Sequence, residues 1–112
     1  MHLLKIDESG ALYDSEEAVD LAQPPGDIII LSSADTEVSL LTAAATSLKH
    51  KNADIGDIRI ANYLSLTHPY SVDLYIEKTA TKARIVVVRL LGGASYWTYG
   101  TQQLRQLAQA TD

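Results

Sequence analysis

The sequence has no cysteine and no phenylalanine, and it contains only one tryptophan in 112 residues. The absence of cysteine excludes a disulfide framework, thiolate catalysis and thiolate metal ligands. No run approaches the roughly 18 apolar residues of a membrane span, and no basic stretch followed by an apolar segment marks a secretory signal. We therefore expect a cytoplasmic protein that does not interact with a membrane.

Positive charge is also scarce, and it is unevenly distributed. Residues 1–37 hold nine acidic residues and one basic residue, Lys5, and the net charge of the chain is −5. Nucleic-acid binding is not expected, because no basic stripe or pattern of alternating basic and aromatic residues is present. The acidic side chains are scattered without the spacing of cation ligands, so they indicate a solvated surface.

Apolar residues make up 46% of the chain, enough for the core of one small domain over residues 1–112. Apolar runs predict strands over residues 1–6, 27–31 and 58–64, and a fourth that starts at Ile85. Helical spacing predicts helices over residues 35–49, 72–81 and 101–110, and a short helical turn within 14–22. Asp35 and Ser71 are the expected N-caps of the first two helices. The alternation predicts an α/β fold, a small Rossmann- or flavodoxin-like four-stranded, mostly parallel sheet with flanking helices.

The segment from Ile85 to Gly100 is the most informative part of the chain. Its three consecutive valines predict a strand that is buried on both faces. The glycine pair Gly92-Gly93 then ends the strand where a side chain would hinder a sharp turn or the approach of a ligand. Aromatic residues, Tyr96 and Trp97 among them, follow at the carboxyl end of the strand, which is the edge where open α/β sheets bind ligands.

No catalytic or metal-binding set emerges from the motifs. The chain has neither a dinucleotide-binding fingerprint, nor a P-loop, nor a nucleophile elbow. His68 follows a strand and could bind a metal or move protons, but it has no second ligand at ligand spacing, so a structural role is the simpler interpretation. The same holds for Gly92-Gly93 as a plain turn and for Tyr96 and Trp97 as packing residues.

Six segments in their order and spacing resemble the amino-terminal region of the large subunits of aerobic cobaltochelatase, the CobN type. They are Met1-His2-Leu3-Leu4, Glu17 to Leu21, Pro25 to Asp35, Arg59 to Leu64, His68 to Tyr75, and Arg89 to Gly100. The resemblance covers most of the chain. Because members of that family are many times longer, it implies that these residues are an amino-terminal fragment of such a subunit.

The resemblance implies an enzyme that inserts Co²⁺ into hydrogenobyrinic acid a,c-diamide during aerobic cobalamin synthesis. It implies two AAA+-type partner subunits that use ATP and Mg²⁺, and relatives that insert magnesium into protoporphyrin. The fragment itself is expected to hold no cofactor and no catalytic residue, and to be inert alone. A stand-alone flavodoxin-like interaction or ligand-binding module is the alternative interpretation.

One surface is predicted to carry any contact with other parts of the enzyme. The order of elements places six residues at strand ends on the carboxyl edge of the sheet. These residues are Ser33, His68, Gly92, Gly93, Tyr96 and Trp97. Their aromatic rings offer stacking area, their glycines allow close backbone approach, and His68 adds a titratable group. We expect this edge to face the remainder of the subunit and its corrin-precursor macrocycle.

Overall fold

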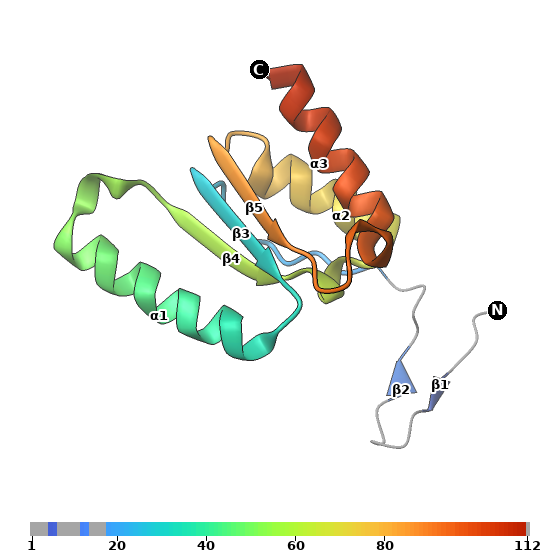
Figure 1. Ribbon diagram of the computed structural model, residues 1–112. Helices are drawn as coiled ribbons and strands as arrows, with labels where there is room; N and C mark the ends of the chain where they lie inside the picture. The colour runs from blue at the N-terminus through green and yellow to red at the C-terminus, as the bar shows by residue number, and fades with distance from the viewer. Residues whose placement is uncertain (1–4, 7–11, 14–17, 112) are drawn as a thin grey trace.

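The computed structural model of the protein describes residues 5–6, 12–13 and 18–111, and it contains a three-stranded parallel sheet (Figure 1). Strand β3 (Ile28–Ser32) lies in the middle, between β4 (Ile58–Asn62) and β5 (Ile85–Arg89). Ile28 is level with Ile58 on one side and with Ile85 on the other. The α/β class, the three later strands and their parallel pairing are confirmed.

The prediction of a fourth strand in this sheet was wrong. β1 (Lys5–Ile6) pairs with β2 (Leu12–Tyr13) in a separate antiparallel ribbon, while residues 1–4 of the expected strand lie outside the described residues. Only five residues separate β1 from β2. A parallel connection needs a dozen or more residues, so neighbouring strands this close in sequence can pair only in the antiparallel sense.

The expected helical turn within residues 14–22 is absent from its described part, residues 18–22, and residues 14–17 lie outside the described residues. The Asp20 carboxylate accepts a hydrogen bond from the backbone N–H of Ala22, whose φ is +55°. Such a local bond from an aspartate offers the backbone an alternative to helix. The turn therefore gives way to an extended segment that leads into β3.

Residues 18–25 are fastened across one end of the molecule by side-chain contacts. Ser71 Oγ accepts from the Val19 N–H at 2.6 Å, and Lys78 forms an ion pair with Asp20. The hydrogen bond from Lys78 lowers the pKa of Asp20 and raises that of Lys78. The Gln23 amide donates to the Ile60 carbonyl at 3.1 Å and so reaches the outer edge of β4. This segment covers that edge.

The helices form where the sequence predicts them, but their caps differ. Helix α1 spans Asp35–Lys51, with Ala34 rather than Asp35 at the N-cap. Helix α2 spans Pro69–Tyr75 and continues as a π-helix over Ile76–Ala80. His68, not Ser71, caps α2 through Nδ1, which accepts from the Tyr70 N–H at 3.0 Å. Pro69 at the first helical position starts the helix three residues early, because its fixed φ suits that position. Helix α3 spans Thr98–Thr111, after a 3₁₀ turn over Ala94–Trp97.

The two faces of the sheet are packed very differently. Ile29 and Leu31 of β3 are fully buried on the face that carries α2 and α3. Side chains alternate between faces along a strand, so Ile28, Ile30 and Ser32 point to the other face, which carries α1. The buried core is Ile29, Leu31, Ala61, Tyr63, Leu66, Val72, Tyr75 and Trp97. It therefore lies almost entirely on the α2–α3 face.

Strand β5 is not buried on both faces, contrary to prediction. Val86 and Val88 pack against the core, whereas Ile85 and Val87 are exposed on the α1 face. Helix α1 contacts β4 and β3, and none of its residues is buried. The three valines indicated a buried central strand, but the strand order 4-3-5 puts β5 at an edge of the sheet, where α1 leaves Ile85 and Val87 uncovered.

The difference between the two faces predicts that the same substitution, isoleucine to alanine, lowers the free energy of unfolding much more in β3 than in β5. Ile29→Ala should lower the free energy of unfolding by about 2–5 kcal/mol, because it opens a cavity in a fully packed face. Ile85→Ala should cost about 1 kcal/mol or less, because half of its side chain is already in water. Denaturant unfolding of both variants measures the difference. Equal losses would contradict a core confined to one face.

Candidate functional site

The carboxyl ends of β3 and β5 form the topological switch point of the sheet. From β3 the chain turns to α1 on one face, and from neighbouring β5 it turns to α3 on the other (Figure 1). In open parallel sheets this divergence creates the crevice where ligands bind. The sequence-predicted edge is therefore the part of this fold in which a site is expected.

A row of polar residues crosses the sheet at this edge. Ser32 is level with Asn62 on β4 and with Arg89 on β5, and each is the last residue of its strand. Ser32 Oγ donates to Glu37 Oε1 at 2.5 Å and accepts from the Ala34 N–H at 3.1 Å. Glu37 Oε2 in turn pairs with Arg89 Nη1 at 2.7 Å. We call Asn62, Ser32, Arg89 and Glu37 the terminal row.

Asn62 ties the other end of the terminal row to the start of α1. Its amide nitrogen donates to Asp35 Oδ1 at 2.7 Å and to the Ser33 carbonyl at 3.3 Å. Its amide oxygen accepts from the Leu64 N–H at 2.8 Å. These three hydrogen bonds fix the loops that follow β3 and β4. The row therefore holds the edge in shape.

None of the four members of the terminal row was among the six site residues predicted from the sequence. The sequence did contain a pattern that could have indicated three of them, since each of the three apolar strands ends in a polar residue. The ion pair between Arg89 and Glu37 joins the end of β5 to the first turn of α1, where an acidic residue also suits the helix dipole. Arg89 keeps most of its side chain in solvent, so it remains the charged group that this edge presents.

The six predicted site residues divide between this edge and the core. Ser33 follows β3 and is half-buried, and His68 caps α2. Gly92 and Gly93 have φ of +95° and +99°, a conformation that glycine adopts without strain. A side chain at Gly92 would meet the Tyr96 ring at 2.6 Å, whereas Gly93 has open space around it. Tyr96 is 70% exposed and is the accessible ring of the edge.

Trp97 belongs to the core instead. It is 6% exposed, and its ring stacks on Tyr63 with centroids 4.9 Å apart and planes at 26°. Its indole Nε1 donates to the Leu66 carbonyl at 2.9 Å. Gly100 makes room for the ring, since a Cβ there would lie 2.1 Å from Trp97 Cε2. Trp97 therefore fastens the start of α3 to the end of β4.

Tyr99 is the third aromatic residue after the glycine turn, and it joins two helices. Its hydroxyl donates to Asp73 Oδ1 at 2.9 Å. This hydrogen bond, with a smaller contribution from burial, raises the pKa of Tyr99. On the neighbouring turn of α2, burial raises the pKa of Tyr75, whose hydroxyl donates to Gln23 Oε1 at 2.9 Å. Both phenols therefore stay protonated and act as donors.

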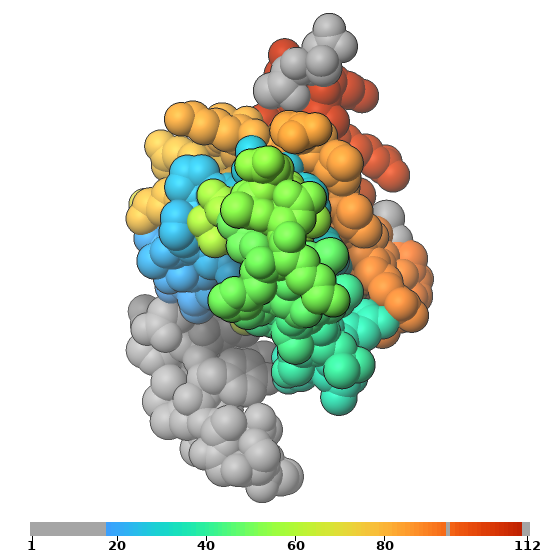
Figure 2. Space-filling model, turned by 90° about the vertical axis from the view of Figure 1, so that its left-hand side faces the viewer, coloured from blue at the N-terminus to red at the C-terminus, as the bar shows by residue number. Residues whose placement is uncertain are grey.

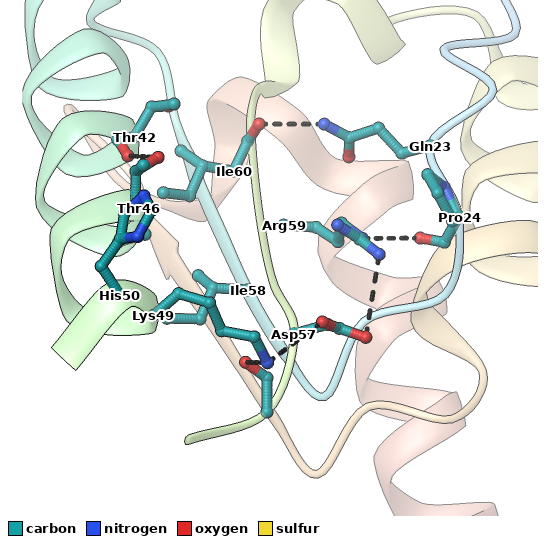
Figure 3. Close-up of a pocket in the computed structure, with 12 residues that line it drawn as sticks. Gln23, Pro24, Thr42, Thr46, Lys49, His50, Asp57, Ile58, Arg59 and Ile60 are labelled. Atoms are coloured by element: carbon teal, nitrogen blue, oxygen red, sulfur yellow. Dashed lines mark hydrogen bonds and ion pairs between the residues drawn. The ribbon is translucent and has the colours of Figure 1, made fainter. Parts of the chain in front are cut away.

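A hollow of about 510 Å³ lies away from this edge, between α1 and the beginning of β4 (Figure 3). Its floor includes Ile58 and Ile60, over which α1 places only the small residues Thr42, Ala45 and Thr46. The charged groups in its wall are already paired. The Lys49 ammonium donates to the Ala53 and Gly56 carbonyls, and the Arg59 guanidinium donates to the carbonyls of Pro24 and Pro25. These bonds hold the Lys49 and Arg59 side chains against the wall of the hollow.

Within residues 5–6, 12–13 and 18–111, no three His, Asp or Glu side chains gather in a group that could hold a metal ion. No helix in this part of the chain has the length and apolar character needed to cross a membrane.

The chain is similar to a segment of two curated proteins named aerobic cobaltochelatase subunit CobN. It is 49% identical to the protein from Sinorhizobium sp. over 109 residues, and 40% identical to the one from Pseudomonas aeruginosa over 109 residues. These matches cover 96% and 97% of this chain but only 8% of each relative. No protein-family profile matches, and neither does any solved structure. The resemblance to the cobaltochelatase large subunit is confirmed.

The two adjacent aromatic residues should respond differently to truncation. Trp97→Ala should lower the free energy of unfolding by about 3–5 kcal/mol, because it removes a buried ring from the core. Tyr96→Ala should change it by about 0.5 kcal/mol or less, because its ring is in solvent. Thermal unfolding followed by far-UV circular dichroism compares them without relying on the tryptophan signal. A large loss in Tyr96→Ala would show that this ring is part of the core.

Proposed function

We propose that this chain is the amino-terminal segment of a cobaltochelatase large subunit, which inserts Co²⁺ into hydrogenobyrinic acid a,c-diamide in aerobic cobalamin synthesis. The observation that carries the proposal is the 49% identity to a CobN protein over nearly the whole chain. A second CobN protein at 40% identity supports the same assignment. The match over 109 residues spans the three strands, the glycine turn and the aromatic helix start together.

Within that subunit, the segment serves as a structural and contact module. It spans 8% of the length of the relatives, so most of the subunit that acts on the macrocycle lies elsewhere. Within the terminal row, Glu37 bonds to Ser32 and Arg89, while Asn62 bonds to Asp35, and these contacts shape the edge. We infer that the segment alone does not insert cobalt, and that ATP and Mg²⁺ are used by two AAA+-type partner subunits in the cytoplasm.

The carboxyl edge is the surface that we assign to contacts with the remainder of the subunit and with the macrocycle. Tyr96 offers an exposed ring, and Gly93 leaves space for close backbone approach. His68 is half-buried, and its Nδ1 is occupied by the α2 cap, so its other ring nitrogen is the one left for a contact. Ser33 and Gly92 shape the crevice, and Trp97 supports it from the core.

The test is cobalt incorporation by the full-length subunit that contains this chain, mixed with both ATPase partners and hydrogenobyrinic acid a,c-diamide. We expect ATP-dependent insertion by the full-length subunit and none when this segment replaces it. Insertion of Mg²⁺ into protoporphyrin instead would assign the subunit to the magnesium branch. Activity with neither macrocycle would reject the proposal and favour a separate binding module.

The same assay tests the carboxyl edge. Tyr96→Ala and His68→Asn in the full-length subunit should weaken macrocycle binding while the melting temperature stays near that of the parent, because Asn keeps a side-chain acceptor for the α2 cap. Tyr96→Phe keeps the ring and should bind normally, and His50→Asn, at the end of α1, is the matched histidine control. Unchanged affinity in both edge variants would reject direct contact of the edge with the macrocycle.

A further inference from the structure

The α1 face of β5 is apolar and uncovered. Ile85 and Val87 are 54% and 47% exposed. They share a face with Arg89, because side chains at alternate positions of a strand point the same way. The Arg89–Glu37 ion pair shows that this face is the one that carries α1. Two β-branched residues of this edge strand are thus in contact with water.

Helix α1 extends this surface with a stripe of its own. Leu40, Ala44 and Leu48 recur every four residues on the side of the helix that includes Glu37, which is the side toward β5. Leu40 is 72% exposed and Leu48 is 47% exposed. We call Leu40, Ala44, Leu48, Ile85 and Val87 the open face. Figure 2 shows α1 (green and teal) beside β5 and the turn after it (orange), with both at the surface.

The two edges of the sheet differ in whether another segment of the chain covers them. On the β4 side, the Gln23 amide bonds to the Ile60 carbonyl and residues 22–25 run past the strand. On the β5 side, no residue of the described ranges 5–6, 12–13 and 18–111 bonds to the outer edge of the strand. An unpaired strand edge next to an uncovered apolar face is a surface prepared for another strand and helix.

We propose that the open face is covered by a further strand–helix unit of the same subunit, which adds a strand parallel to β5 and a helix beside α1. This inference rests on the proposed function, because the CobN relatives supply the additional chain, more than nine-tenths of their length. The two crossovers, β3–α1–β4 and β4–α2–β5, run in opposite directions across the sheet and have their helices on opposite faces, which is the arrangement that the right-handed rule requires. Since α3 lies on the α2 face, the same rule carries a following strand to the outer side of β5.

The charge pattern argues against a second copy of the chain as the occupant. Residues 78–111 contain five basic residues and no acidic one. Two β5 strands paired edge to edge would bring Arg84 and Arg89 of both copies together, and like charges placed opposite each other destabilise a sheet. A partner strand from elsewhere in the subunit, with apolar or acidic side chains toward Arg84, meets no such repulsion.

The experiment uses the full-length subunit without its ATPase partners. Val87→Cys and Leu40→Cys are treated with a maleimide, and modification of each peptide is quantified by mass spectrometry. We expect both thiols to react about tenfold or more slowly than in the denatured subunit, because a covered group reacts only after local opening. Tyr70→Cys, 56% exposed on α2, is the matched control outside the open face.

A photoreactive residue in place of Leu40 then identifies the occupant. Cross-links to a later segment of the same subunit support the proposal. Cross-links between two copies, with thiol reactivity that rises on dilution, would overturn it in favour of a dimer interface. Fast labelling at any concentration would overturn it as well. Neither readout depends on cobalt insertion, so an active subunit with an accessible Val87→Cys rejects this inference and leaves the proposed function intact.

Discussion

Close packing around Ile29 and Leu31 is the interaction on which the rest of the structure depends. Both lie in the middle strand, are fully buried and meet residues of α2, of the turn after β4 and of the start of α3. The opposite face of the same strand has only α1 above it, and α1 buries none of its residues. The sheet is therefore densely packed on the α2–α3 face and thinly covered on the α1 face. Most of the packing that stabilises the fold lies on the α2–α3 face.

The densely packed face also positions the candidate site. The stack of Trp97 on Tyr63 and the indole bond to Leu66 fix where α3 begins, and that in turn sets the glycine turn after β5. The terminal row then aligns the three strand ends and joins them to α1 through Glu37. An exposed ring at Tyr96 and a charged group at Arg89 are the features left facing outward at the switch point.

Patterns in the sequence were enough to predict the three parallel strands and the three helices, because apolar runs and helical spacing are local signals. They could not reveal strand order, so the valines of β5 were interpreted as a central strand when they lie at an edge. The N-cap of α2 was predicted wrongly for a related reason. Ser71 bonds to Val19, which is far away in sequence, and His68 caps the helix instead. At the site, the glycine turn was predictable, whereas the burial of Trp97 depends on Tyr63 and Leu66, about thirty residues away in sequence.

The most direct test of a core confined to one face is amide hydrogen exchange, residue by residue, in this 112-residue segment by itself under native conditions. The account predicts that β3 amides, bonded on both sides and packed against the α2–α3 face, exchange only by global unfolding. Amides of α1 should exchange through smaller local openings, because no residue of that helix is buried by this chain. Protection of α1 equal to that of β3 in the segment would contradict the account.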